Sequence, residues 1–431
     1  DPVPVRTNAG SCLFTNPKAP AGPTAAPAAP TATPVPARPT PAPAAKITVV
    51  FGWYGAEDLQ AIMKTHIAKF QTENPNITID MQIQPFNTYF EKLPVSMTGG
   101  TAPDVFFLVS GQVQNFAAMG GCLPLDDVIA PDKLKAFRPA QIKLCTYKGK
   151  VLSLPFTATI VTPYINKGFF QKANVTPPTA YKDAWTWDDL AASLKKVKEA
   201  NSLVYAMLNG GRDFWWLPWL YGNGAVLVNE TLDKAAINTP EAEEALTFLQ
   251  SLTKDKIIAP PPEPADLFYQ SKVAVFSDGH WSIKALSKNI KGAFDIGVMF
   301  FPKRKAPSLG LGGDYLSAYE KSKVREAAVK WLNYMTDKDV LTDYCSKNNY
   351  IPPREDIAPN YGEFTCILEL AQSEAKEMGS PLMTLHRGLP QYEKIRQVFQ
   401  AEYELVMLGQ KTPKDALKAM ETGINNALSG K

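Results

Sequence analysis

The residues best suited to chemistry in this sequence are aromatic side chains beside isolated polar groups. Residues 210–224 (GGRDFWWLPWLYGNG) are the densest example, with Trp215, Trp216 and Trp219 between two glycine-rich ends and only two charged residues. An aromatic run of this density either fills a core or lines a ligand cavity. We favour the cavity, with Trp215 and Trp216 facing the ligand and Trp219 holding the segment to the core.

Smaller groups of aromatic and polar residues stand where predicted strands end. A pyranose ring stacks its apolar face on tryptophan or tyrosine, while its hydroxyl groups require carboxylate, amide or guanidinium partners. The combination therefore predicts a sugar-binding site. A position in the core is the alternative for each tryptophan taken alone. The candidates outside the 210–224 run are Trp53, Tyr54, Ser110, Gln112, Asp278, His280, Trp281, Asp314 and Tyr315.

Sequence motifs for common catalytic and cofactor sites do not occur. There is no GxSxG, Walker A, HExxH or GxGxxG motif, and no CxxC accompanies the three histidines, so we expect neither a cofactor nor a metal site. His66 is expected on a helix, where a lone histidine usually serves packing or lies at the surface. Only His280 has both polar and aromatic neighbours.

Length and charge set limits on the architecture and on the partners. A single core stops growing at roughly 250–300 residues, so 431 residues predict two lobes. The net charge of +3, without a long run of one sign, argues against a nucleic-acid partner. No stretch offers the roughly 20 apolar residues of a membrane span. Residues 1–45, rich in proline and alanine, are expected to form a disordered, semi-rigid spacer.

The predicted elements alternate as in an α/β protein. A strand at residues 46–51, a helix through Leu59–Phe70 and a strand at 77–84 form a β-α-β unit, and residues 105–109 read as a buried strand. Ligands of such sheets bind outside the carboxyl ends of the strands. A strand at residues 272–276 leads into the SDGHW turn, and the chain finishes in helices at 392–407 and 413–428.

Four cysteines form two pairs that are close in sequence. Cys122 with Cys145 and Cys345 with Cys366 suit two disulfides in an oxidising compartment, and buried free thiols are the alternative. Cys12 lies apart, in the spacer.

The order of these segments resembles the extracellular solute-binding proteins of ABC importers, specifically the carbohydrate-binding family 1 related to maltose-binding proteins. The resemblance implies a periplasmic-binding-protein-like type II α/β fold, with two lobes joined by crossing hinge strands. The segments that carry the resemblance are KITVVFGWYG, FQTENPNITID, GGTAPDVFFL, GCLPLDD, YKGKVLSLPF, YINKGFFQKANVTPPTAYKDAWTWDDL, KVAVFSDGHW, GLGGDYLSAY, AAVKWLNYMTDKDV and NNYIPPRED.

The resemblance also implies a domain division and a cellular setting. Residues 46–154 with 305–338 would form the N-lobe, and 155–304 with 339–431 the C-lobe. The protein would be a monomeric, non-enzymatic carrier, located at the cell surface outside the cytoplasm or in a periplasm, that delivers a carbohydrate to a membrane permease. Cys12 would carry a lipid anchor.

The family's ligand contacts would fall on the strand-end residues named above, on Trp215 and Trp216, and on Asp104, Arg354 or Arg387. A capping role beside Pro103 is the alternative for Asp104. Two other functions remain open. A glycerol phosphodiester would use arginines such as Arg212, a polyamine would use aspartates flanked by aromatic residues, and a metal chelate is a further alternative. A glycoside-active enzyme would need a carboxylate pair such as Asp278 and Asp314, about 5–10 Å apart.

Overall fold

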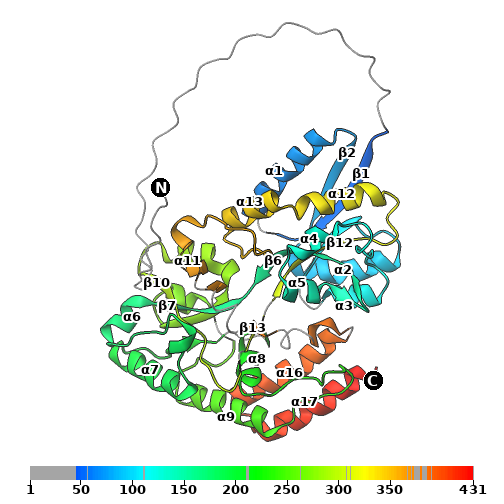
Figure 1. Ribbon diagram of the computed structural model, residues 1–431. Helices are drawn as coiled ribbons and strands as arrows, with labels where there is room; N and C mark the ends of the chain where they lie inside the picture. The colour runs from blue at the N-terminus through cyan, green and yellow to red at the C-terminus, as the bar shows by residue number, and fades with distance from the viewer. Residues whose placement is uncertain are drawn as a thin grey trace, which may run out of the picture.

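Two separate sheets organise the chain (Figure 1). The first has the strand order β2 (Ile77–Ile83), β1 (Ile47–Trp53), β3 (Val105–Val109), β12 (Gly312–Ala318) and β6 (Leu154–Thr159). The computed structural model describes residues 45–55, 57–109, 112–209, 213–262, 264–306, 308–310, 312–365, 367–369, 371–372, 379–380, 386–389 and 391–430.

The first sheet confirms the predicted β-α-β unit. β1 pairs in parallel with β2 along its whole length and with β3, and α1 (Glu57–Glu73) makes the crossover. β12 lies between β3 and the edge strand β6 and runs antiparallel to both. The remaining elements of this half are α2 (Phe86–Thr98), α3 (Gln112–Ala118), α4 (Pro131–Lys135), α5 (Pro139–Leu144), the hairpin β4 (Thr146–Tyr147) and β5 (Lys150–Val151), and α12 (Arg325–Met335).

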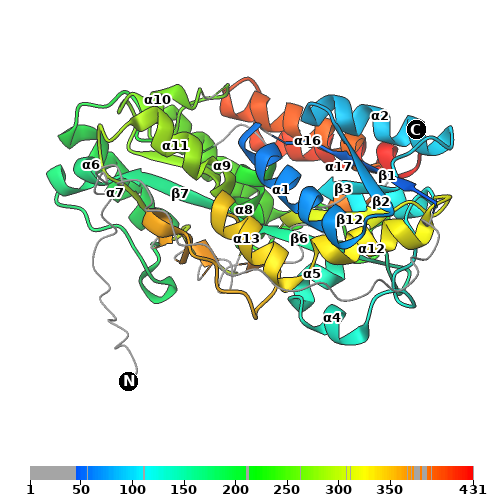
Figure 2. The ribbon, with the colours of Figure 1, turned by 90° about the horizontal axis from the view of Figure 1, so that it is seen from above.

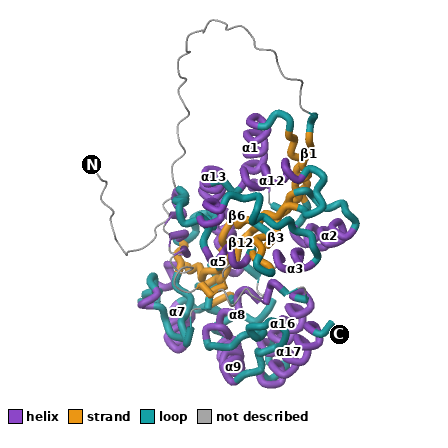
Figure 3. Tube along the Cα trace, turned by 45° about the vertical axis from the view of Figure 1, so that its right-hand side comes forward, coloured by secondary structure: helices purple, strands orange, loops and turns teal. Residues whose placement is uncertain are grey.

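The second sheet has the order β10 (Ile296–Val298), β7 (Val161–Asn166), β9 (Val275–Gly279) and β8 (Met207–Leu208). Its helices are α6 (Lys167–Lys172), α7 (Trp187–Ala200), α8 (Asp213–Gly222), α9 (Pro240–Lys254), α10 (Asp266–Tyr269), α11 (Ile283–Ile290), α16 (Tyr392–Met407) and α17 (Pro413–Leu428). α9, α16 and α17 pack together beside α8 (Figure 3). Short segments complete the chain: η1 (Tyr181–Asp183), η2 (His280–Ser282), η3 (Gly362–Phe364), η4 (His386–Gly388), β11 (Leu309–Gly310) and β13 (Gly379–Ser380).

Strands β6 and β7 carry the chain from one sheet to the other. Ile160 is the only residue between them, and it is fully buried. Figure 2 shows the two strands as successive parts of one path through the middle of the molecule. A polar contact secures this point, because the backbone N–H of His280 donates to the carbonyl oxygen of Ile160 at 3.2 Å.

Separate apolar cores lie against the two sheets, and one helix falls on the other side of the predicted lobe boundary. α13 (Lys338–Asn348) places Val340, Leu341 and Tyr344 in the core of the five-stranded sheet. It therefore packs with residues 46–154, although residues 339–431 were assigned to the C-lobe. The packing follows from its apolar face, which meets α1 and α12. The rest of the division into lobes stays a prediction.

The aromatic run forms a buried helix. α8 contains Phe214, Trp216, Leu217, Trp219 and Leu220, all buried, while Trp215 is half-buried. A helix that is apolar on every side is stable only inside a core. Most of the run therefore serves packing of the second half of the chain. Among the described residues, no helix has the length and apolar character required to cross a bilayer.

The predicted disulfide between Cys122 and Cys145 is wrong. Both are buried free thiols, as is Cys345, whose predicted partner Cys366 lies outside the described residues. Closeness in sequence does not make the two cysteines partners here. The backbone of Cys122 forms an isolated antiparallel β-bridge with Tyr319, whereas Cys145 is the C-cap of α5. Burial raises the pKa of the Cys122 thiol to about 12. The alternative prediction, buried free thiols, is therefore correct for Cys122, Cys145 and Cys345.

Candidate ligand-binding site

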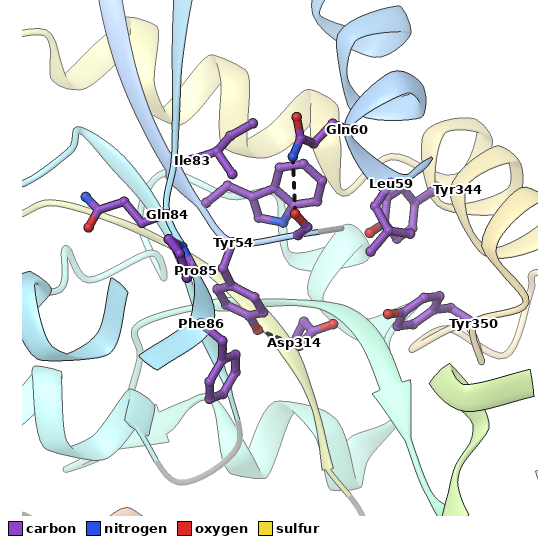
Figure 4. A pocket seen from close by; sticks show the side chains of 12 residues that line it. Tyr54, Leu59, Gln60, Ile83, Gln84, Pro85, Phe86, Asp314, Tyr344 and Tyr350 are labelled. Carbon is purple, nitrogen blue, oxygen red and sulfur yellow. Dashed lines mark hydrogen bonds between the residues drawn. The ribbon is translucent and has the colours of Figure 1, made fainter. Parts of the chain in front are cut away.

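A cavity of about 500 Å³ opens at the carboxyl ends of β1 and β2 (Figure 4). The edge of a parallel sheet where strands end is the usual ligand position in α/β proteins. α1, α2, β12 and the segment around α13 supply the other walls. The lining residues are Trp53, Tyr54, Gly55, Leu59, Gln60, Ile83, Gln84, Pro85, Phe86, Asp314, Tyr344 and Tyr350.

Aromatic rings form much of the cavity wall. The ring of Tyr54 meets Phe86 edge-on, with centroids 5.0 Å apart, and also contacts Tyr89 and Phe90. Phe86 begins α2 and is 44% exposed, so its ring is accessible to a ligand. Trp53 also lines the cavity, but it is only 2% exposed and offers a ligand little surface. Tyr54 and Phe86 therefore offer the apolar surfaces.

Asp314 forms the polar end of the cavity. Its Oδ1 accepts a hydrogen bond from the Tyr54 hydroxyl at 2.9 Å, and its Oδ2 accepts one from the Thr157 hydroxyl at 2.8 Å. Burial raises the pKa of the Asp314 carboxyl, and the two hydrogen bonds oppose part of that shift. Burial also raises the pKa of Tyr54 well above its ordinary value, and the neighbouring carboxylate adds to the effect. Both side chains are thus held in one arrangement.

The backbone around Asp314 explains the GGDY sequence. The pairing of β12 with β6 shifts register between Asp314 and Tyr315, and a Cβ on Gly313 would collide with the Thr157 carbonyl oxygen. Tyr315 points to the opposite face of the strand, as successive strand residues do. It is fully buried and donates to Gln141 Oε1 at 2.9 Å. The expectation that Tyr315 contacts a ligand is therefore not supported by its position.

The DGHW turn supplies no lining residue, but it contacts the cavity wall at Tyr350. His280 is fully buried and its imidazole meets the Tyr350 ring edge-on, with centroids 5.0 Å apart. Trp281 is 38% exposed and contacts the other side of His280. Asp278 caps its own turn, accepting from the Gly279 N–H and the Ser282 hydroxyl. His280 thus packs against the lining residue Tyr350, Trp281 packs against His280, and Asp278 is occupied within its own turn.

Acid should destabilise the fold through two buried histidines. Burial is the main cause that lowers the pKa of His280 and of His386 to about 3. Because the unfolded pKa is about 6.5, their contribution is present above that pH and is lost as pH falls toward 3. Between pH 7 and pH 5, each should remove about 2 kcal/mol from the free energy of unfolding.

Urea denaturation at pH 7, 6 and 5 measures this effect. The difference in stability between pH 7 and pH 5 should shrink by about 2 kcal/mol in His280→Gln and in His386→Gln relative to the native chain. Asp278 and Asp314 have raised pKa values and act in the opposite sense, but they do so equally in native and variant chains. An unchanged pH dependence in both variants would contradict the prediction.

Some other predicted site residues do not line the cavity, and the rest lie outside the described residues. Asp104 accepts from the Val50 N–H at 2.9 Å and the Ser322 hydroxyl at 2.6 Å, which is the capping alternative. Arg354 makes a two-point ion pair with Asp356, at 2.9 and 2.8 Å. Gln112 begins α3, and Ser110 and Arg212 lie outside the described residues, as does Cys12.

The second half of the chain holds the last candidates in a packed arrangement. Arg387 pairs with Asp213 at 2.9 Å, and its guanidinium lies 4.4 Å from the centre of the Phe214 ring. Trp216 is fully buried against Tyr403. Trp215 is half-buried, and its Nε1 finds no hydrogen-bond partner among the described residues. Of the aromatic run, only Trp215 keeps a surface for a ligand.

Several lining residues escaped sequence reasoning. Gln84 and Phe86 directly follow β2, so the rule about strand ends could have found them. Tyr344 and Tyr350 come from α13 and the segment after it, which return to the first sheet from far along the chain. No local pattern indicates that return.

Comparison with known proteins gives a consistent picture. The family described as bacterial extracellular solute-binding protein matches residues 65–365. An ABC substrate-binding protein from Listeria monocytogenes, solved in complex with cycloalternan, is 26% identical with a TM-score of 0.78, covering 89% of this chain and 99% of that one. A protein of Brucella abortus (strain 2308) named as a binding protein is 24% identical, over 81% of this chain and 85% of its own. The sn-glycerol-3-phosphate-binding periplasmic protein of Escherichia coli (strain K12) is 22% identical, over 88% and 92%.

Proposed function

The chain belongs to the bacterial extracellular solute-binding protein family, and from that premise we propose that it captures a carbohydrate for an ABC importer. The observation that carries the proposal is the cavity at the end of β1, where the exposed ring of Phe86 and the ring of Tyr54 stand beside the carboxylate of Asp314. Aromatic faces with one well-placed acceptor suit a sugar ring and its hydroxyl groups.

The alternative ligands fit the cavity less well. A phosphodiester requires converging basic groups, and the described lining residues include no lysine, arginine or histidine. Arg354 and Arg387 are engaged with carboxylates elsewhere. A polyamine requires several acids, and Asp314 is the only carboxylate among the described lining residues. The likeness to a glycerol-3-phosphate-binding protein therefore supports the fold rather than that ligand.

We infer that the chain acts as a carrier and not as an enzyme. A glycoside-cleaving mechanism needs two carboxyl groups that flank the scissile bond. Asp278 is committed to the Gly279 N–H and the Ser282 hydroxyl, so it is not positioned as the partner of Asp314. Nothing else in the described lining supplies a second carboxylate.

The cellular setting completes the proposal. The protein would work outside the cytoplasm as a monomer, anchored by a lipid on Cys12 or held in a periplasm, with residues 1–45 as the spacer. Its two lobes, joined by β6 and β7, would close on the sugar and present it to the permease. Ligand contacts from both lobes would shift the balance toward the closed form by their difference in affinity.

Phe86→Ala should weaken sugar binding by roughly tenfold with little effect on the melting temperature. The change removes an accessible stacking face, while the partly exposed ring contributes little to the core. Isothermal calorimetry against a panel of neutral mono- and oligosaccharides measures the affinity.

Val95→Ala is the matched control, because Val95 lies on the same helix, is 72% exposed and is not a lining residue. It should leave sugar affinity unchanged. A native chain that binds no sugar of the panel and does not become more compact in small-angle scattering would refute the proposed function.

A further inference from the structure

We propose that Tyr54, Asp314 and Thr157 make the polar end of the cavity a pure hydrogen-bond acceptor, which selects neutral sugars and rejects their phosphate esters. This inference rests on the proposed function and deepens it. It concerns how the site separates two ligand chemistries that proteins of this fold accommodate.

The hydrogen bonds determine what the polar end can offer. The Tyr54 hydroxyl has one hydrogen, which it donates to Asp314 Oδ1, and the Thr157 hydroxyl donates its hydrogen to Oδ2. One hydrogen arriving at each carboxylate oxygen is the arrangement of the ionised form. After these bonds, Asp314 and Tyr54 retain lone pairs and no hydrogen. A ligand group that meets them must therefore be a donor.

A second side chain adds to the acceptor character. Gln84 lines the cavity, and its Oε1 is buried without a hydrogen-bond partner among the described residues. The side-chain amide of Gln60, by contrast, donates one of its two hydrogens to the Gly55 carbonyl oxygen at 3.3 Å. Sugar hydroxyls can donate to such acceptors, whereas the oxygens of a phosphate dianion cannot.

Charge works in the same direction. A phosphate group would meet the negative charge of Asp314, and no cationic side chain is found among the described lining residues to offset the repulsion. Like charges interact strongly where water is excluded. The neutral sugar escapes this penalty and keeps the hydrogen bonds.

Thr157 is a positioning residue in this arrangement. It is fully buried and is not a lining residue, yet its Oγ1 both donates to Asp314 Oδ2 and accepts the Asp314 N–H at 3.3 Å. The two residues are direct partners in the antiparallel pairing of β12 with β6, just before its register shifts. Thr157 thus keeps the carboxylate aligned with the Tyr54 hydroxyl.

The test compares four disaccharides with their 6-phosphates: maltose, cellobiose, sucrose and trehalose. Calorimetry with the native chain should show binding of at least one neutral sugar, and its phosphate should bind at least a hundredfold more weakly. A phosphate that binds as well as its neutral partner overturns this inference and leaves the proposed function standing. Binding of no member of the panel overturns this inference, and binding of spermidine in place of the sugars overturns both.

Variants assign the selectivity to the named side chains. Asp314→Asn keeps the shape but removes the charge and adds two donor hydrogens, so the preference for the neutral sugar should fall at least tenfold. Thr157→Val should also reduce the preference, and Thr157→Ser, which retains the hydroxyl, should restore it. Asp278→Asn is the control, because that carboxylate serves only its own turn among the described residues.

Melting curves accompany each variant, so that a failure to fold is recognised. If Asp314→Asn does not fold, the valine and serine variants decide the question alone. Equal preference in Thr157→Val and Thr157→Ser would show that the Thr157 hydroxyl has only a structural role, and it would overturn the assignment.

Discussion

Replacing Trp216 by alanine is expected to lower the free energy of unfolding by about 3–5 kcal/mol. The indole is fully buried and lies parallel to the Tyr403 ring, with centroids 4.3 Å apart. It meets Phe399 edge-on, and its Nε1 donates to Gln400 Oε1 at 3.1 Å. Alanine removes these contacts and leaves a large cavity between α8 and α16. Urea denaturation followed by circular dichroism measures the loss.

Trp215→Ala is the matched control, since Trp215 is the half-buried neighbour on the same helix. It should cost less than half as much stability. The sequence alone suggested the reverse for Trp216, namely weaker ligand binding with little change in melting temperature. A loss below about 1 kcal/mol would return Trp216 to a cavity wall and contradict its packing role.

Asp213→Asn is expected to lower the free energy of unfolding by about 3–5 kcal/mol, because it leaves the charge of Arg387 buried without its counter-ion. Burial alone would raise the pKa of Asp213, but the charge of Arg387 and the Tyr392 hydroxyl, which donates at 2.6 Å, hold it below its ordinary value. The pair ties η4 to the first turn of α8. Denaturation at pH 7 measures the change.

An exposed ion pair provides the comparison. Glu393→Gln breaks the pair with Arg396 on the surface of α16 and should cost less than about 1 kcal/mol. The double variant Asp213→Leu with Arg387→Met should recover most of the stability lost in Asp213→Asn, because no charge is left buried. A similar small loss in Asp213→Asn and Glu393→Gln would contradict the importance of the buried pair.

Local patterns in the sequence were sufficient for the first sheet. The alternation in residues 77–84 and the apolar run at 105–109 predicted β2 and β3, and the parallel pairing of β1 with β2 followed from the crossover rule. The helix predicted at 413–428 is confirmed as α17, whose first turn is capped by the Thr412 side chain. These features depend on residues that are close together in the sequence, so local patterns are enough to predict them.

The site was predictable only in part. Tyr54 follows the carboxyl end of β1, as the topology rule predicts, and it lines the cavity. Asp314 also lines the cavity, but it lies inside β12 and not at a strand end, because the GGDY segment continues as a strand. Tyr344 and Tyr350 line it because α13 packs on the first sheet, a contact between distant segments. The prediction that Trp216 faces the ligand is not supported by its position, because a cluster of aromatic residues has the same sequence pattern in a cavity wall and in a core. Only its contacts with Tyr403 and Phe399 of α16 show that it belongs to the core.

The three buried thiols among the described residues can report when the fold opens. Cys122, Cys145 and Cys345 are buried, and burial raises the pKa of each thiol, so the reactive thiolate is scarce while the fold is intact. Cys122 and Cys145 report on the core beside the first sheet, and Cys345 reports on α13 behind Asp314. The rate of alkylation at each cysteine therefore measures how often the region around it opens, and no cysteine has to be introduced for the measurement.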